Sequence, residues 1–182
     1  MIRAIKTKYS GILFASTLEA DWAKTLDAWG IVWSYEPEGL KLPSGQNYRC
    51  DFYLPRLRTW FEVKGEHNQR VFKPAELAAA EVHQFDCDTT VCGHSIINPM
   101  RNVIVARSAI GGKSVFEFPK GVPGKAALLV CDVCGQRSFT NVDGPAVCRR
   151  CRQDCSGSSM YLSGSLKFHQ VAHGGGTRKR AS

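Results

Sequence analysis

Two Cys-x₂-Cys pairs near the end of the chain constrain its fold more than any other feature of the sequence. Cys131 and Cys134 form the first pair, Cys148 and Cys151 form the second, and 13 residues separate the two pairs. This spacing is typical of a zinc ribbon, in which two knuckles close a tetrahedral site that has no open position for chemistry. We therefore predict that these four cysteines bind a structural Zn²⁺ ion, in a module spanning residues 127–158.

Other cysteines and histidines offer alternative metal ligands. Cys155 could replace one of the four thiols, although a fifth thiol in such a module is more often free. Cys148 and Cys151 could instead bind a metal with His169 and His173, but the 17 intervening residues exceed the usual finger spacing, so the ribbon ranks well above this arrangement. A further group is too irregular in spacing to rank highly, namely His83, Cys87, Cys92 and His94.

The length of the chain allows one compact core with a small appendage. It has 182 residues, of which 43% are hydrophobic, and no apolar run approaches the roughly 20 residues that cross a bilayer. The basic start of the chain precedes only a short apolar stretch at 11–15, without the pattern of an export signal. We therefore expect a soluble protein without a membrane partner, located in the cytoplasm, or in that of a bacterial host if a phage encodes it.

The charge of the chain is basic and uneven. Lys and Arg number 24 against 16 Asp and Glu, a formal net charge of +8, and residues 159–182 hold four basic residues and no acidic one. A basic protein attracts polyphosphates through counterion release, yet many cytosolic proteins are equally basic. Charge alone therefore gives weak support for a nucleic-acid partner.

Hydrophobic periodicity predicts an α/β fold. Apolar residues spaced by four, four and three predict a helix over 17–29, which Gly30 ends. Strands are predicted over 31–36, 48–54 and 59–64, and the last two form an antiparallel hairpin, while 40–47 is a turn. A second helix from Pro74 and strands over 103–106 and 114–118 follow. This order predicts a mixed sheet flanked by helices.

The predicted hairpin brings several polar residues together. Glu62 and Lys64 lie two residues apart on one strand, so both point to the same face of the sheet, and the hairpin brings Asp51 beside them. Two carboxylates and a backbone carbonyl, that of Val63, are the hard oxygen ligands that Mg²⁺ or Mn²⁺ takes. Lys64 could position or activate the attacking water, and Glu19, on the first helix, could complete the site.

An isolated Glu-x-Lys triplet is weak evidence, because most such triplets form surface ion pairs or lie on solvated strands. Here Trp60 and Phe61 precede Glu62, and Phe52 follows Asp51, so both carboxylates lie in strands suited to burial, where unpaired charge is costly. A bound metal gives a reason for acids in such strands. We therefore favour a metal site over a solvated ion pair.

These residues and their setting resemble the PD-(D/E)XK nuclease superfamily, in particular small phage and actinobacterial endonucleases and Holliday-junction resolvases. The resemblance covers about residues 10–110 and rests on the segments LEADWA at 18–23, YEP at 35–37, RCDF at 49–52 and WFEVKG at 60–65. It assigns the acidic roles to Glu19, Asp51 and Glu62, and the catalytic lysine to Lys64. Cys50 stands where the family name places a proline, a position that varies among members.

The resemblance implies a restriction-endonuclease-like mixed sheet in a nuclease domain at 1–118. Pro and Gly indicate a linker at 119–126, the zinc ribbon follows at 127–158, and a basic flexible tail is expected at 159–182. The implied activity is Mg²⁺-dependent endonucleolytic hydrolysis of DNA phosphodiester bonds, with junctions or flaps in recombination, repair or phage DNA processing among the substrates. Resolvases of this superfamily act as dimers, so a homodimer is one implied assembly.

Basic and amide side chains near the second helix and in the ribbon suit contact with the phosphates of DNA. These candidate nucleic-acid-binding residues are Gln69, Arg70, Lys73, Arg149, Arg150 and Arg152. Two alternatives compete with the endonuclease: a noncatalytic DNA-binding or assembly protein that keeps the fold, and an RNA-processing nuclease.

Overall fold

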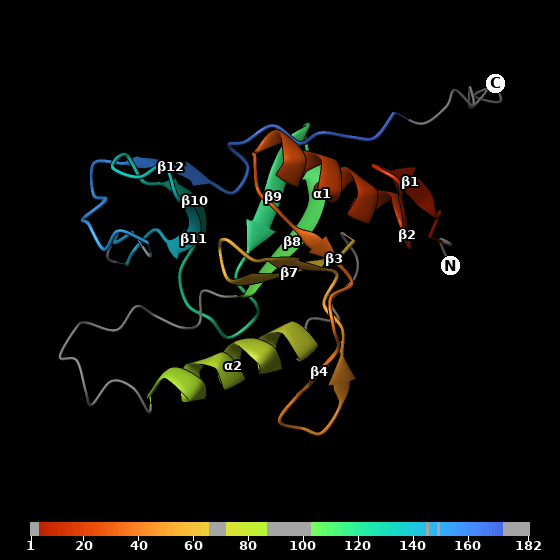
Figure 1. The fold of residues 1–182 in the computed structure, drawn as a ribbon, viewed down its shortest axis with the longest axis horizontal. Helices are drawn as coiled ribbons and strands as arrows, with labels where there is room; N and C mark the ends of the chain where they lie inside the picture. Colours follow the sequence, from red (N-terminus) through yellow and green to blue (C-terminus); the bar gives the residue numbers. More distant parts are fainter. Residues whose placement is uncertain (1–3, 66–71, 87–102, 145, 149, 173–182) are drawn as a thin grey trace.

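The computed structural model describes residues 4–65, 72–86, 103–144, 146–148 and 150–172. A five-stranded mixed sheet lies at its centre (Figure 1), in the order β3-β6-β7-β8-β9. All neighbours in this sheet are antiparallel except β7 and β8, which run parallel. The strands are β3 (Ser34–Tyr35), β6 (Phe52–Leu54), β7 (Thr59–Val63), β8 (Val103–Ile110) and β9 (Lys113–Glu117). The predicted mixed α/β architecture is confirmed. In the described part of the chain, no helix is long and apolar enough to span a membrane.

The two helices in the described part of the chain cover opposite faces of this sheet. α1 (Thr17–Ala28) packs Trp22 and Leu26 against Phe52 and Phe61 in the main core. α2 (Phe72–Asp86) packs Leu77 and Ala78 into a second cluster with Tyr48, Cys50 and Val103. Figure 1 shows the sheet between the two helices. α2 starts at Phe72, two residues before the predicted start at Pro74. A proline is tolerated in the first turn of a helix because the N–H groups there have no partner within the helix.

The predicted hairpin forms, but its first strand is shorter than expected. β6 pairs with β7 in the register Tyr53↔Trp60, so successive side chains alternate between the two faces. The single strand predicted over 48–54 is wrong, because residues 49–51 leave the β6–β7 ladder. The Asp51 N–H donates to a carboxylate oxygen of Glu62, and its carbonyl accepts from the N–H of Glu36 at 2.8 Å. Asp51 therefore lies just before β6 rather than within it.

Two small hairpins flank the sheet. β1 (Thr7–Tyr9) pairs with β2 (Ile12–Phe14) through a two-residue turn, Ser10 and Gly11, whose φ angles are both positive, as such tight hairpin turns require. β4 (Leu40–Lys41) pairs with β5 (Asn47–Tyr48), so the segment predicted as a plain turn at 40–47 is a hairpin. This second hairpin approaches α2 and brings Tyr48 to the α2 face of the main sheet.

The cysteine-rich segment forms a second sheet that shares the main core. β10 (Ala126–Val130) lies between β11 (Arg137–Asn141) and β12 (Ser159–Leu162). Phe139 lies 6.0 Å from Phe61 and 5.3 Å from Phe116, measured between ring centroids. Ala126, at the end of the predicted linker, is already a buried core residue. The linker at 119–126 therefore does not separate two independent cores.

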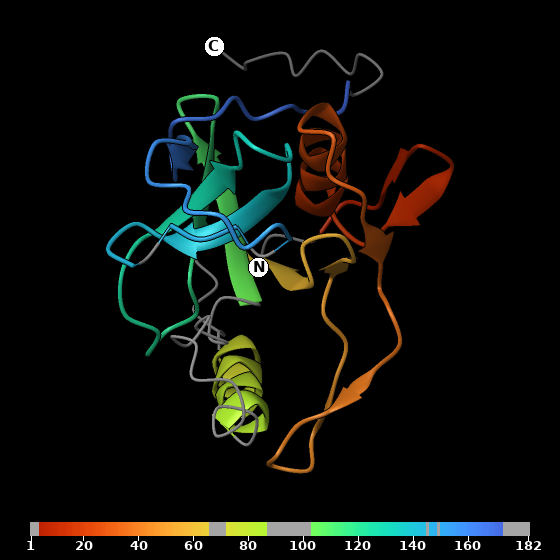
Figure 2. The same ribbon diagram turned by 60° about the vertical axis from the view of Figure 1, so that its left-hand side comes forward.

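The expectation of a flexible tail from residue 159 is wrong for residues 159–172. β12 lies within that range, and the following residues pass over β9 and along α1 (Figures 1 and 2). Phe168 is buried against Trp22 at 5.2 Å between ring centroids. The His169 N–H donates to Thr25 at 2.9 Å, and the Val171 N–H donates to Asp21 at 2.6 Å. Residues 173–182 lie outside the described residues.

Candidate active site and cysteine cluster

Asp51, Glu62 and Lys64 meet at one end of the β6–β7 hairpin. The Asp51 N–H donates to Oε2 of Glu62 at 3.3 Å, and the Val63 N–H donates to Oδ2 of Asp51 at 2.7 Å. Lys64 Nζ forms a short hydrogen bond and an ion pair with Oε1 of Glu62. The structure therefore brings together three of the four residues that the sequence assigned to catalysis.

Like charges are crowded in this site. Glu62 is buried, with 4% of its surface exposed, and Asp51 is partly buried beside it. Burial and the neighbouring Glu62 carboxylate raise the pKa of Asp51 to about 7, although the Val63 N–H and the Lys64 ammonium act in the opposite direction. Among the described residues, Lys64 is the one cation that forms an ion pair with these two carboxylates. A divalent ion would offset this repulsion more fully than the single ammonium does.

One carboxylate oxygen of the pair is open to a ligand, and a second is bonded to the Lys64 ammonium. Oε2 of Glu62 and Oδ2 of Asp51 accept hydrogen bonds from the protein. Within the described residues, Oδ1 of Asp51 makes no hydrogen bond, and Oε1 of Glu62 accepts from the ammonium of Lys64. One or two carboxylates are the usual protein ligands of Mg²⁺. The donor set fits such an ion, which would take the place of the ammonium.

Glu19 is not part of this pair. Its carboxylate accepts from the Ser16 hydroxyl at 2.7 Å and the Tyr35 hydroxyl at 2.6 Å, while Ser16 accepts from the Glu19 N–H. Because the Glu19 carboxylate also accepts from the Ala15 N–H at 3.2 Å, this arrangement is a variant of the capping box at the start of α1. Glu19 is near enough to Asp51 to contribute to its raised pKa. However, Glu19, Asp51 and Glu62 do not form a group whose ligand oxygens all lie within 4.8 Å of one another.

Val63 and Tyr48 complete the surroundings of the pair. Val63 was predicted to offer its carbonyl to a metal, and the contact that it makes with Asp51 is through its N–H. The Tyr48 hydroxyl donates to Oε2 of Glu62 at 2.7 Å, a contact that the sequence reasoning missed. Tyr48 lies on a different hairpin, so no spacing rule links it to Glu62.

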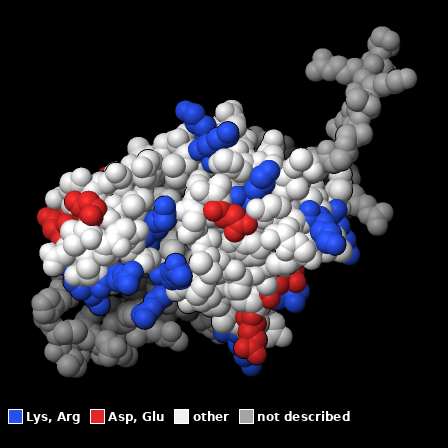
Figure 3. Space-filling view, turned by 45° about the horizontal axis from the view of Figure 1, so that its top comes forward, with Lys and Arg blue, Asp and Glu red and all other residues white. Residues whose placement is uncertain are grey.

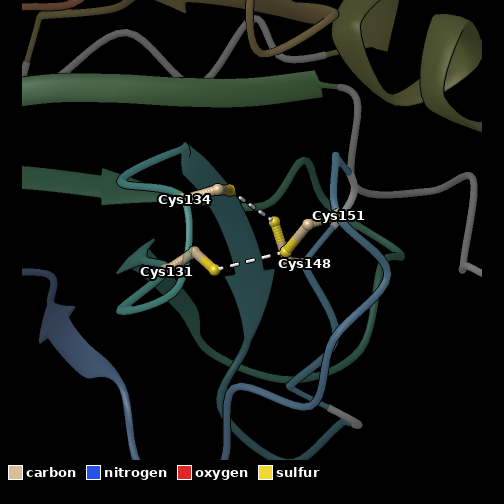
Figure 4. Close-up of side chains that lie close together, drawn as sticks. All are labelled: Cys131, Cys134, Cys148 and Cys151. Carbon is tan, nitrogen blue, oxygen red and sulfur yellow. Dashed lines mark hydrogen bonds between the residues drawn. The ribbon is translucent and has the colours of Figure 1, made fainter.

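The four predicted zinc ligands come together as a compact cluster. Their Sγ atoms all lie within 4.8 Å of one another, and the pairs Cys131–Cys151 and Cys134–Cys148 are 3.6 Å apart. Zn–S bonds of about 2.3 Å in a tetrahedron separate the sulfurs by about 3.8 Å. Figure 4 shows the four side chains pointing toward one another from two loops. This geometry is compatible with a structural zinc ion.

The two loops that carry the cysteines have the same backbone geometry. In the first, Gly135 N–H donates to the Cys131 carbonyl and Cys131 N–H to the Gln136 carbonyl, both at 2.9 Å. The second repeats both bonds at 2.9 Å, 17 residues later, with Cys148, Arg152 and Gln153. Gly135 and Arg152 both have positive φ, at 68° and 63°. The cluster is therefore held by two equivalent knuckles.

The thiols of the cluster differ in acidity. Backbone N–H groups, that of Cys134 first, lower the pKa of Cys131 to about 6. The Gln153 N–H lowers the pKa of Cys151, but burial and the other three thiols raise it to about 12. Four neighbouring thiolates repel one another unless a cation lies between them, which a divalent metal ion supplies. All four cysteines lack disulfide partners in the structure.

The structure places only some of the alternative metal ligands that the sequence offered. Cys155 is buried against the cluster, where its thiol lies within 4.8 Å of the Cys131 thiol, and it makes a contact with the Gln153 carbonyl at 3.6 Å. It is not one of the four mutually close thiols. The backbone N–H of His169 bonds to α1. The remaining alternatives have side chains outside the described residues, namely His83, Cys87, Cys92, His94 and His173.

Three of the predicted nucleic-acid contacts can be placed. Lys73 Nζ donates to the Asn47 carbonyl at 2.9 Å and lies 6.0 Å from the centre of the Tyr48 ring. Arg150 and Arg152 are exposed on the second knuckle, and neither forms an ion pair with a described residue. Figure 3 shows basic side chains in several separate groups with acidic ones between them. The other three candidates lie outside the described residues: Gln69, Arg70 and Arg149.

Comparison of the chain with models of protein families, with curated proteins and with solved structures found no match.

Proposed function

We propose that this protein is a metal-dependent DNA endonuclease with a restriction-endonuclease-like fold. The observation that carries the proposal is the meeting of Asp51, Glu62 and Lys64 at the end of one hairpin, where Oδ1 of Asp51 is unbonded among the described residues and Oε1 of Glu62 faces the Lys64 ammonium. A carboxylate pair with an adjacent lysine is the set of groups that the PD-(D/E)XK resemblance predicts for phosphodiester hydrolysis.

The order of elements supports the same proposal. α1 precedes β3 and the β6–β7 hairpin, and α2 then leads to β8, which pairs parallel to β7. A helix, a hairpin that carries the acidic residues and the lysine, and then a helix and a strand are the core that the resemblance implies. This shared order of elements supports a catalytic role for the acidic pair.

The protein's own groups suggest how the reaction would proceed. Oδ1 of Asp51 and Oε1 of Glu62 would hold Mg²⁺ or Mn²⁺, which when bound polarises the scissile phosphate and lowers the pKa of a bound water. Lys64, released from Glu62, would orient the attacking water or bind a phosphate oxygen. The hydrogen bonds from Val63 and Asp51 N–H groups would keep the two carboxylates in place throughout.

We propose that a structural Zn²⁺ ion occupies the cysteine cluster and that the basic residues around the two sites contact DNA. Arg150 and Arg152 are exposed and Lys73 lies at the start of α2, where a helix dipole adds to the attraction for phosphate. Binding through such residues falls steeply with salt, because it releases counterions. A salt titration of DNA binding with Arg150→Ala and Arg152→Ala variants tests this part.

Cleavage of labelled substrates tests the enzymatic proposal. The zinc-loaded protein is incubated with duplex, flap, single-stranded and four-way-junction DNA, and with matching RNA, in Mg²⁺, Mn²⁺ or EDTA. We expect metal-dependent cleavage of DNA that is lost in Asp51→Asn and Lys64→Ala, with zinc content and DNA binding intact. Cleavage that persists in both variants contradicts the assignment. Paired cuts across a junction would support a homodimer, and preferential cleavage of RNA would favour an RNA-processing nuclease.

One observation favours a second candidate, a noncatalytic DNA-binding or assembly protein. Glu19 is engaged by Ser16 and Tyr35 rather than by the acidic pair. A chain that had lost catalysis could keep this acid for the helix cap alone. Binding of DNA without cleavage of any substrate in the panel would support this candidate.

A further inference from the structure

The two oxygens of Glu62 have different partners. Oε2 accepts two hydrogen bonds, from the Tyr48 hydroxyl at 2.7 Å and from the Asp51 N–H at 3.3 Å. Oε1 faces the ammonium of Lys64. Glu62 could otherwise rotate its carboxylate and offer either oxygen, or both, to a cation. The two donors on Oε2 oppose that rotation.

Tyr48 is well suited to hold this orientation. It is 5% exposed and packs with Leu42, Cys50 and Leu77. A tyrosine hydroxyl is protonated at neutral pH, and here it donates to Oε2 of Glu62 at 2.7 Å. The hydroxyl therefore adds a neutral donor beside a carboxylate, without another charge.

The hairpin that carries Tyr48 is fixed to α2 at two points. The Ser44 N–H donates to the Glu76 carboxylate at 2.6 Å near the tip, and Lys73 Nζ donates to the Asn47 carbonyl at 2.9 Å near the base. Lys73 also lies over the Tyr48 ring. The position of the hydroxyl is thus set by α2 and the β4–β5 hairpin, which are separate from the β6–β7 hairpin that holds the acids.

We propose that Tyr48 is a positioning residue that makes Glu62 present a single oxygen, Oε1, to the metal ion, an inference that rests on the proposed nuclease site. Partners that orient a metal ligand in this way commonly change metal affinity or activity about 10- to 100-fold when they are removed. The effect of Tyr48 is therefore expected on metal binding, and not on the fold or on the cysteine cluster.

Tyr48→Phe tests this role because it removes the hydroxyl and keeps the ring in the α2 cluster. Mn²⁺ binding to the zinc-loaded protein is followed by electron paramagnetic resonance, and the Mg²⁺ dependence of DNA cleavage is measured in parallel. We expect the dissociation constant for Mn²⁺ and the Mg²⁺ concentration at half-maximal rate both to rise about tenfold. The rate at saturating Mg²⁺ should change much less, because the metal then enforces the same orientation.

Tyr53→Phe is the matched control. Tyr53 lies on β6, its ring 4.5 Å from the Trp60 ring and tilted by 43°, and its hydroxyl makes no hydrogen bond with a described residue. It should leave Mn²⁺ affinity unchanged. Equal Mn²⁺ affinity in Tyr48→Phe and wild type would overturn the inference. An equal loss of Mn²⁺ binding, zinc content and melting temperature in Tyr48→Phe would also overturn it, because that pattern indicates a structural role.

The proposed function can fail separately from this inference. If the wild-type protein binds Mn²⁺ at Asp51 and Glu62 but cleaves no substrate, the proposed nuclease activity is contradicted. The Mn²⁺ affinity of Tyr48→Phe still tests the role of Tyr48 in that case. If the Asp51→Asn variant binds Mn²⁺ as tightly as the wild type does, both the proposed metal site and the positioning role of Tyr48 are wrong.

Discussion

The acidic site and the cysteine cluster both bring like charges together, but one is open and the other is closed. The cysteine cluster has four ligands within 4.8 Å of one another, held by two equivalent knuckles. The acidic site has two carboxylates, in which Oδ1 of Asp51 is unbonded among the described residues and Oε1 of Glu62 is bonded to the Lys64 ammonium. A closed set of four ligands suits a structural ion, whereas open positions leave room for water and substrate.

The two sites also differ in how the chain builds them. Each knuckle bonds within itself over six residues, so its geometry is local. The acidic site combines Tyr48 at the end of β5, Asp51 just before β6 and Glu62 on β7. Lys64 comes directly after the last residue of β7. The two sites nevertheless depend on one core, since Phe139 of the cysteine-rich sheet packs on Phe61 of the hairpin. Unfolding of the cysteine cluster should therefore disturb the acidic site as well.

Removal of zinc is expected to have the largest effect. Structural zinc contributes on the order of 10 kcal/mol in small modules, comparable with the whole stability of about 5–15 kcal/mol of a typical domain. We expect Cys134→Ser, or chelation, to lose the metal and the cooperative thermal transition. Cys155→Ser is the control and should keep one zinc per chain, as measured by atomic absorption. Zinc retained in Cys134→Ser and lost in Cys155→Ser would show that the fifth thiol is a ligand.

Loss of the contact between Phe168 and Trp22 should have the second-largest effect on stability. Phe168→Ala removes a buried ring that packs on Trp22, and such a change costs about 3–5 kcal/mol. We expect a single unfolding transition at lower temperature, with both sites lost together. Phe72→Ala, whose side chain is 74% exposed, should have little effect. Two separate transitions in Phe168→Ala would show that the two sheets do not share a core.

The charge of Asp51 should make the metal-free protein less stable as pH rises. Its pKa is about 7 in the folded chain against an ordinary value of 3.8, so the folded state binds more protons between pH 4 and pH 7. At about 1.36 kcal/mol per pKa unit, the cost at pH 8 reaches at most about 4 kcal/mol. Asp51→Asn should be more stable than wild type at pH 8, and the gap should close by pH 4.

Chemical denaturation of both proteins at several pH values measures this pH dependence. The same measurement with Mg²⁺ added is the control. Saturating Mg²⁺ at pH 8 should recover the stability of the wild type and leave Asp51→Asn unchanged, because the ion offsets the repulsion between the carboxylates. Identical pH profiles for the two proteins would be inconsistent with the crowded site described above.

The smallest expected effect compares the two knuckles. Arg152 has the positive φ that Gly135 adopts without strain, and a non-glycine residue there costs on the order of 1 kcal/mol. Arg152→Gly should raise the unfolding free energy by up to about 1 kcal/mol, and Gly135→Arg should lower it by a similar amount. An added Cβ at Gly135 meets no atom within 4 Å, so only backbone strain enters. Equal signs in the two variants would contradict the equivalence of the knuckles.

The sequence predicted the features that depend on local spacing. The Cys-x₂-Cys pairs placed the four thiols together, because each knuckle closes within six residues. Alternation and the short connection predicted the hairpin that brings Glu62 and Asp51 together. The role of Glu19 could also have been found, since Ser16-x-x-Glu19 before an apolar helix is the sequence pattern of a capping box.

The features that were missed depend on distant contacts. Phe168 packs on Trp22 from 146 residues away, and a Gly- and Ser-rich basic segment gives no periodic sign of such packing. Tyr48 reaches Glu62 from a hairpin that is paired with β4 and not with β7. At the break before β6, the Asp51 N–H donates to the Glu62 carboxylate, a contact that strand propensity does not describe. In each case tertiary structure decided the outcome.

Anomalous diffraction from crystals of the zinc-loaded protein soaked in Mn²⁺ tests the contrast between the two sites most directly. We predict a zinc peak at the centre of Cys131, Cys134, Cys148 and Cys151, and a manganese peak between Oδ1 of Asp51 and Oε1 of Glu62, with Lys64 moved off Glu62. Manganese absent from the acidic pair, with the ammonium of Lys64 still bound to Glu62, would contradict the account.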